Sequence, residues 1–242
     1  MTTPFTMRDM WTKKGGDDAS SDESDEEWDE EPWLCAEDFR EKLNVSDEEW
    51  PYFQAIFERK TSMRDLEVGV PTEMIPGKLY IGDSSCVRAE YTETLRSLGI
   101  TAVLNVAANQ GSPADQKYLA PMWKKGIEDE TVLYKAIACD DDIEYPLLKN
   151  HWDAACEFLD RALAQGRPVL VHCVQGLNRS GLIVCAYYML HTKTSLVPAV
   201  EFLRSKRGPE ALKNPGFMVQ LVRFAAEHDL LGEKTTVHEE TA

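Results

Sequence analysis

Short apolar runs alternate with amphipathic stretches over most of the chain between residues 71 and 232. Apolar runs bounded by Gly or Pro predict β-strands, and apolar positions three or four residues apart predict helices. We therefore expect strands at residues 74–81 (broken by Pro76-Gly77), 102–106, 132–138 and 168–172. The helical pattern covers residues 87–98, 147–165, 182–192, 196–206 and 215–231. Strands that alternate with helices, followed by a helical cluster, predict a layered α/β domain.

A second, shorter amphipathic stretch precedes this domain, within residues 36–70. Ser46 and Glu49 have the spacing of a capping box, which marks the start of a helix. Pro51 would break a regular helix that began at Ser46, so a start near Trp50, with the proline in the first turn, is favoured. We expect this stretch to form a short accessory helical segment.

Charge is distributed unevenly along the 242 residues, since residues 1–50 hold 17 acidic and 5 basic side chains in a chain of net charge −16. Residues 15–31 read GGDDASSDESDEEWDEE, and so few apolar partners cannot offset the entropy lost on ordering. We expect residues 1–35 to form a disordered acidic tail and residues 233–242 a C-terminal tail. Acidic stretches with scattered tryptophans sometimes dock onto other proteins, so the N-terminal tail is also a candidate docking segment.

Composition also excludes several functions. A polyanionic chain gains nothing from counterion release, so we expect no binding to nucleic acid or to anionic membranes as the main activity. The six cysteines form no C-x-x-C pair and no zinc spacing, which indicates a reducing compartment and no metal site. No apolar signal segment opens the chain, and no apolar run is long enough to span a bilayer. We expect a cytoplasmic and/or nuclear protein that needs no metal and no cofactor.

The most informative stretch is VLVHCVQGLNRSG at residues 169–181, where a buried strand breaks into a loop and then enters an apolar helix. A loop at a helix N-terminus turns its backbone N–H groups inward, and together with the helix dipole these form a cradle for a phosphate dianion. A glycine within such a loop lets the backbone bend without a Cβ clash. The residues expected to form the cradle are Val174, Gln175, Gly176, Leu177 and Asn178.

Cys173 lies at the base of this cradle, where the positive field favours its thiolate, the nucleophilic form. Arg179 follows six residues later and can hold two phosphate oxygens with its planar guanidinium. Ser180 can hydrogen-bond the sulfur and ease its departure as a leaving group. For His172, a hydrogen bond that supports the loop and the thiolate is favoured over a role as ligand or base. The alternative without chemistry is a cysteine that simply packs at the end of a strand.

These residues form the pattern H-C-x5-R-S, which resembles that of the cysteine-dependent protein phosphatases, specifically the small atypical dual-specificity phosphatases that include the poxviral enzyme. The similarity covers roughly residues 71–231: residues 78–82 resemble their opening strand, 98–105 the strand after their first helix, and 206–209 and 214–217 their closing segment. The resemblance implies one catalytic domain with a protein-tyrosine-phosphatase-like fold, a central mixed sheet flanked by helices and a shallow active site. It also implies hydrolysis of phosphotyrosine and/or phosphoserine/phosphothreonine in protein substrates through a phosphocysteine intermediate, without metal.

That mechanism requires a general acid, because the departing alkoxide or phenoxide is a poor leaving group. Three aspartates at positions 140–142 follow a predicted strand, and the acid of the family aligns best with Asp141. The sequence alone leaves Asp140 open as the alternative. Arg207 aligns with a basic residue that binds a second phosphate in some relatives, although the segment after it is about two residues longer here.

Two other functions remain open from the sequence. RNA 5′-triphosphatases also carry an asparagine before the loop arginine, as Asn178 stands here, and a departing diphosphate would need little help from Asp141. A non-catalytic phosphoprotein-binding module would instead use the acidic extension as its main functional part. The intact set of Cys173, Arg179 and Asp141 argues against the second, since a pure binder needs no nucleophile.

Overall fold

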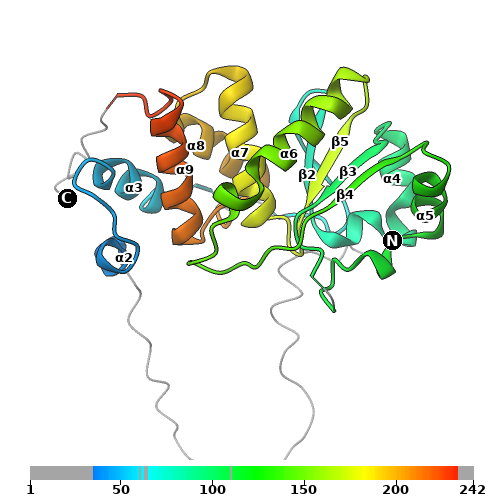
Figure 1. Ribbon diagram of the computed structural model, residues 1–242, viewed down its shortest axis with the longest axis horizontal. Helices are drawn as coiled ribbons and strands as arrows, with labels where there is room; N and C mark the ends of the chain where they lie inside the picture. The colour runs from blue at the N-terminus through cyan, green and yellow to red at the C-terminus, as the bar shows by residue number, and fades with distance from the viewer. Residues whose placement is uncertain (1–34, 60, 63–64, 110, 234–242) are drawn as a thin grey trace, which may run out of the picture.

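The computed structural model describes residues 35–59, 61–62, 65–109 and 111–233 (Figure 1). The expected acidic tail, except for Cys35, and the C-terminal tail beyond residue 233 lie outside the described residues, so both tails stay predictions. No helix in the described ranges is both long and apolar enough to cross a membrane.

A five-stranded sheet forms the centre of the fold. Its strands are β1 (Thr72–Ile75), β2 (Leu79–Gly82), β3 (Ala102–Asn105), β4 (Leu133–Ala136) and β5 (Val169–His172). They lie in the order β1-β2-β5-β3-β4, with β1 antiparallel to β2 and all other neighbours parallel. The expected mixed sheet is therefore confirmed. Because the carboxyl ends of parallel strands meet at one edge of a sheet, the segments that follow β2, β3, β4 and β5 gather there.

Helices cover both faces of this sheet. The helices of the described residues are α2 (Ala36–Lys42), α3 (Trp50–Phe57), α4 (Thr92–Ser97), α5 (Pro121–Glu128), α6 (Leu147–Ala164), α7 (Arg179–Thr192), α8 (Leu196–Arg207) and α9 (Pro215–Glu227). The same part of the chain also contains three short 3₁₀ helices, η1 (Ser84–Val87), η2 (Ala89–Tyr91) and η3 (Gln116–Tyr118). Helices α6 to α9 lie on one side of the sheet, and α4 and α5 lie on the other (Figure 1).

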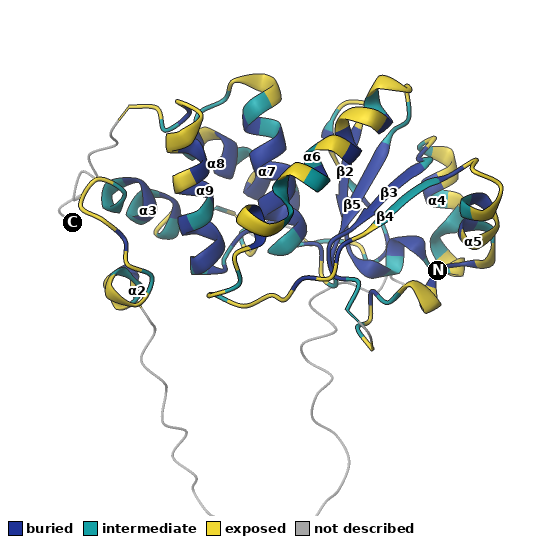
Figure 2. Ribbon diagram, viewed as in Figure 1, coloured by how far each residue is buried: buried dark blue, intermediate teal, exposed yellow. Residues whose placement is uncertain are grey.

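The alternation of side chains along each central strand explains this arrangement. Every residue of β2, β3 and β5 is buried (Figure 2). In β5, Val169 and Val171 join the core under α6 and α7, whereas Leu170 joins the smaller core with Trp123 of α5. Successive side chains of a strand point to opposite faces of the sheet. A strand whose residues are nearly all apolar therefore needs helices on both faces to bury them.

The accessory segment packs against the C-terminal helices through a buried arginine. Arg204 of α8 is fully buried, and its guanidinium donates to the carbonyl oxygens of Ile56 in α3 (2.6 Å) and of Arg59 just after that helix (3.3 Å). The same guanidinium donates to Ala211 (3.1 Å) and Leu212 (3.1 Å), which precede α9. Burial lowers the pKa of Arg204 to about 10, which still leaves it charged at neutral pH.

Several element boundaries differ from those expected, with local reasons. The start of α3 at Trp50, with Pro51 in its first turn, is confirmed. The helix expected at residues 87–98 begins only at Thr92, because the Asp83 side chain caps the 3₁₀ turn η1 and Arg88 is extended (φ −83°, ψ 164°). The last helix ends at Glu227 rather than residue 231 and closes with a bond from Leu230 N–H to the Ala225 carbonyl (2.7 Å). Helix α5 was not expected at all.

Candidate active site

The loop between β5 and α7 holds its carbonyl oxygens outward. Four of them accept hydrogen bonds from outside the loop: Val174 O from Ser84 N–H (2.9 Å), Gln175 O and Gly176 O from the Arg207 guanidinium (3.3 and 3.0 Å), and Leu177 O from Leu212 N–H (3.2 Å). No cis peptide bond occurs in the described chain, and in a trans peptide each N–H points opposite to the preceding carbonyl. The N–H groups of residues 175–178 therefore point to the inside of the loop, as a phosphate cradle requires.

The sulfur of Cys173 lies at the base of this loop. It accepts hydrogen bonds from the Gly176 N–H (3.2 Å) and the Ser180 hydroxyl (3.3 Å), and the residue is 1% exposed. Helix α7 begins at Arg179 directly after the loop, so the positive end of its dipole faces the same space. Both donors and the dipole stabilise negative charge on the sulfur, which is the state a nucleophilic cysteine needs.

Gly176 allows the loop to pass close to the backbone of β2. Its φ is +72°, and a Cβ at this position would lie 2.4 Å from the carbonyl oxygen of Gly82. A second clash, at 2.5 Å, would involve the Arg207 guanidinium. Only glycine combines this backbone conformation with this contact.

His172 supports the first peptide of the loop. The ring is fully buried between Gly82 and Asn105 in the sheet register, and its Nδ1 lies 3.2 Å from the Cys173 carbonyl oxygen. Burial lowers the pKa of His172 to about 4, so the ring is neutral near pH 7. Because a carbonyl only accepts, Nδ1 carries the proton of this bond. The ring thus holds the backbone next to the nucleophile without adding a charge.

This burial predicts a loss of stability in acid. An unfolded histidine has a pKa of about 6.5, so between pH 6.5 and 4 the unfolded chain binds a proton that the folded chain does not. The contribution of neutral His172 is complete above about pH 6.5 and is lost as the pH falls towards 4, about 3 kcal/mol in total. In urea unfolding between pH 7 and about pH 4.5, we expect wild type to lose about 2 kcal/mol more than His172→Asn. Equal losses in the two proteins would contradict the assignment.

Arg179 and Asp141 meet at the rim of the loop. The Nη1 group of Arg179 donates to the Cys139 carbonyl (3.0 Å), and its Nε lies 3.5 Å from the Asp141 carboxylate. Asn214, before α9, donates its side-chain amide to the other oxygen of Asp141 (3.1 Å). The structure thus brings Asp141 to the arginine of the loop and holds it with a second contact. Its side chain remains 30% exposed, which leaves it accessible to a substrate.

Asp140 lies in a different environment. Its carboxylate accepts from the side-chain amide of Asn109, in the segment that follows β3. No hydrogen bond or ion pair between Asp140 and Arg179 is found in the described residues, whereas Asp141 forms an ion pair with Arg179. The two aspartates that the sequence could not separate therefore point to different neighbours.

Asn178 and Asn214 connect the loop to the segment before α9. The side-chain oxygen of Asn178 accepts from the N–H groups of Lys213 (2.9 Å) and Asn214 (3.2 Å). Asn214 also caps α9, since its side-chain oxygen accepts from Phe217 N–H (3.3 Å). The sequence placed Asn214 in the segment 214–217, just before a predicted helix, and did not predict its contact with Asp141.

Arg207 supports the loop from behind. Its side chain is 1% exposed and donates to the loop carbonyls of Gln175 and Gly176 and to Thr72 Oγ1 (3.2 Å). The Asp83 carboxylate lies 3.9 Å from its guanidinium. The guanidinium is therefore buried behind the loop and holds its carbonyls outward, and the expected role in binding a second phosphate stays a prediction.

Comparison with known proteins agrees with this geometry. The family model "Dual specificity phosphatase, catalytic domain" matches residues 79–227. Dual specificity protein phosphatase 26 of Bos taurus is 34% identical over 151 residues, which cover 62% of this chain and 64% of that relative's length. Dual specificity protein phosphatase 1B of Arabidopsis thaliana is 34% identical over 163 residues, which cover 67% of this chain and 87% of the relative.

Solved structures show the same fold. Human DUSP28 superposes with a TM-score of 0.53 at 30% identity, covering 66% of this chain and 95% of that chain. A mouse putative dual specificity phosphatase complexed with zinc tungstate has a TM-score of 0.54 at 29% identity, covering 72% of this chain and all of that chain (100%). The family match includes β2, α9 and the loop between β5 and α7, which we call the phosphate loop. It extends over more than half of the sequence. This chain belongs to the dual specificity phosphatase family.

Proposed function

We propose that the chain is a protein phosphatase that hydrolyses phosphotyrosine and/or phosphoserine/phosphothreonine in proteins through a phosphocysteine intermediate. The observation that carries the proposal is the environment of the Cys173 sulfur, which accepts two hydrogen bonds beneath inward-facing amides. A cysteine that only filled space would need neither donor. Family membership supports the same activity, and the substrates are proposed to be phosphorylated proteins.

In the first step, the Cys173 thiolate attacks phosphorus, an S–P bond forms and the bond from phosphorus to the leaving oxygen breaks. The loop amides and the guanidinium of Arg179 bind the non-bridging oxygens and stabilise the charge on the group being transferred. The leaving oxygen takes a proton from Asp141, so it departs as an alcohol or phenol. The products of this step are the dephosphorylated side chain and the phosphocysteine.

In the second step, Asp141 is a carboxylate and accepts a proton from water as the water oxygen attacks phosphorus. The S–P bond breaks, phosphate leaves and the thiolate of Cys173 forms again. Ser180 donates its hydrogen bond to the departing sulfur, which makes the thiolate a better leaving group. Asp141 is then protonated for the next cycle.

Asp141 is the proposed acid because its carboxylate lies beside Arg179 and is held by Asn214. We expect Asp141→Asn to lower kcat on a phosphopeptide by about 10²-fold or more, since an amide cannot supply the proton. Asp140→Asn is the matched control, because it makes the same change one residue away, and we expect its kcat to stay within about threefold of wild type. Steady-state kinetics with an alkyl phosphopeptide measure both. A larger loss in Asp140→Asn would transfer the role to that residue.

The same assay separates the other two functions. Release of phosphate from triphosphate-ended RNA faster than from phosphopeptides, and independent of Asp141, would indicate an RNA 5′-triphosphatase. Phosphopeptide binding without any phosphate release by wild type would indicate a binding module.

All six cysteines are free thiols, which supports the proposed location in the cytoplasm and/or nucleus.

A further inference from the structure

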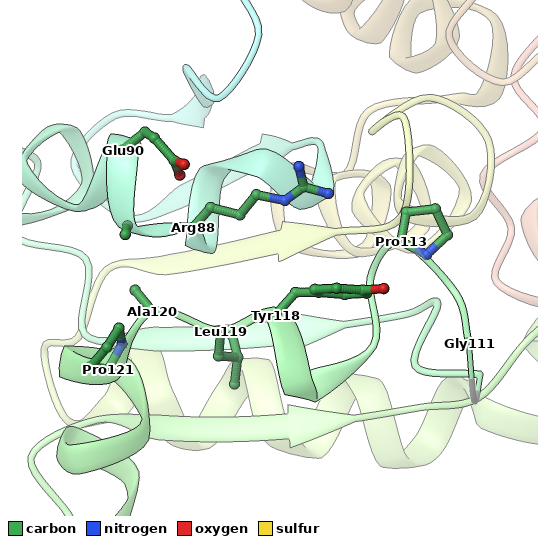
Figure 3. Close-up of a pocket in the computed structure, with 9 residues that line it drawn as sticks. Arg88, Glu90, Gly111, Pro113, Tyr118, Leu119, Ala120 and Pro121 are labelled. Atoms are coloured by element: carbon green, nitrogen blue, oxygen red, sulfur yellow. The ribbon is translucent and has the colours of Figure 1, made fainter.

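A pocket of about 470 Å³ opens between the segment after β2 and the segment after β3 (Figure 3). Both segments follow carboxyl ends of parallel strands, so the pocket belongs to the same edge of the sheet as the phosphate loop. Its lining includes Arg88, Glu90, Gly111, Pro113, Tyr118 and Leu119. None of these residues takes part in the proposed phosphate chemistry.

Hydrogen bonds connect one wall of this pocket to the phosphate loop and the other wall to Asp140, the residue before Asp141. On one side, the η1 turn that precedes Arg88 begins at Ser84, whose N–H donates to the Val174 carbonyl of the phosphate loop. On the other side, Asn109, two residues before Gly111, donates its side-chain amide to Asp140. The pocket is therefore built on segments that contact the phosphate loop and the residue before Asp141, so a peptide bound at that loop can extend towards it.

Arg88 is the positive group of the pocket. Its Nε is buried and has no hydrogen-bond partner among the described residues, and no carboxylate in those ranges forms an ion pair with it. The guanidinium lies 5.9 Å from the centre of the Tyr118 ring. In a chain of net charge −16, an arginine without a carboxylate partner at a pocket can bind an anion from outside.

Tyr118 supplies an apolar surface next to this charge. Its side chain is 47% exposed, more than that of any other large hydrophobic residue the structure describes. Arg88 and Tyr118 extend in the same direction, towards Pro113, from opposite sides of the pocket (Figure 3). Glu90 lies on the Arg88 side and carries the one negative charge of the lining. Lys117 is close to the ring as well, at 4.9 Å, but its ammonium group is paired with Asp115.

We propose that this pocket is a substrate subsite, in which Arg88 binds a negatively charged side chain that flanks the phosphorylated residue of a protein substrate. Tyr118 packs against the apolar part of the same peptide. This inference rests on the proposed function and adds to it a substrate class, phosphoproteins with an acidic residue near the phosphorylated one. A carboxylate and a second phosphate share the required chemistry, and separate peptides distinguish them.

The test uses the full-length protein and peptides that share one phosphorylated residue and differ at a single flanking position, which carries Glu, a second phosphoresidue, Ala or Lys. At one or more flanking positions we expect wild type to give a kcat/KM about fivefold higher with Glu than with Ala, the size expected of one accessible ion pair. Arg88→Glu should reverse the order so that Lys is preferred, and Arg88→Gln should remove the preference. Arg96→Glu, with the same charge change on α4, is the matched control and should keep it.

Hydrolysis of a small aryl phosphate separates this proposal from the proposed function. That substrate has no flanking residues, so we expect Arg88→Glu and Arg88→Gln to hydrolyse it within about twofold of wild type, which also shows that both variants are folded. Wild type without aryl phosphatase activity would overturn the proposed function. Wild type that is active on the aryl phosphate but indifferent to the flanking charge, or an Arg88→Glu variant that still prefers Glu, would overturn only the subsite.

Discussion

Replacing Cys173 with serine should lower kcat by at least about 10⁴-fold on phosphopeptides and on aryl phosphates alike. A serine hydroxyl at this position keeps the size of the side chain and can still accept from the Gly176 N–H and the Ser180 hydroxyl. It is not ionised near neutral pH, and among the described residues no basic side chain forms a hydrogen bond with the sulfur that it replaces. Burial lowers the pKa of the neighbouring His172 ring to about 4, so that ring is a weak base. Phosphate release under single- and multiple-turnover conditions measures the loss.

The matched control for this change is Cys156→Ser. Cys156 lies on α6, away from the loop, and burial raises the pKa of its thiol to about 11, so it is no nucleophile near neutral pH. We expect wild-type kcat in this variant. The Cys173→Ser protein should still bind phosphopeptides, because the cradle and Arg179 are intact. Turnover by Cys173→Ser at more than a few per cent of the wild-type rate would rule out its thiolate as the nucleophile.

Arg179→Lys should lower kcat by about 10²–10³-fold, although the charge is kept. A guanidinium binds two phosphate oxygens in one plane, whereas an ammonium is a point charge on a flexible stem. Lysine would also lose the bond from Nη1 to the Cys139 carbonyl (3.0 Å), which sets the direction of the guanidinium. The loss should appear mainly in kcat, because the three non-bridging oxygens move into one plane in the transition state, where the planar guanidinium fits them better than in the bound substrate.

Arg161→Lys is the matched control for this second change. Arg161 lies in the last turn of α6, and its guanidinium lies over the Phe158 ring, 5.8 Å from the centroid. We expect kcat and KM of this variant to equal those of wild type. If Arg179→Lys stayed within about tenfold of wild type in kcat, planar binding of two oxygens would not be part of the mechanism.

The sequence was sufficient where structure depends on neighbours along the chain. The four strand regions and the loop at residues 173–178 were predicted because apolar runs, glycines and the cysteine–arginine spacing are all local signals. Helix α5 escaped prediction because Gly126 interrupts its pattern. A Cβ there would lie 2.6 Å from Val132, so the glycine serves close packing rather than ending a helix.

Contacts between distant residues could not be predicted in the same way. Asn214 and Asp141 are 73 positions apart, and nothing in either segment indicates that the amide of one reaches the carboxylate of the other. Arg207 lies 31 positions after the carbonyl that it binds, and alignment with relatives suggested a different role for it. Whether an arginine faces substrate or supports a loop from behind depends on burial, which only the folded chain determines.

The most direct measurement is to trap the covalent intermediate. Protein is mixed with a phosphopeptide, stopped within milliseconds by neutral denaturant, digested and analysed by mass spectrometry. The Ser180→Ala variant is included because loss of its hydrogen bond to the sulfur should slow breakdown of the intermediate. We expect one added phosphoryl group, on Cys173, with more of it in Ser180→Ala than in wild type and none in Cys173→Ser. A phosphoryl group on any other residue, or steady turnover with no phosphorylated protein in either form, would contradict attack by the Cys173 sulfur.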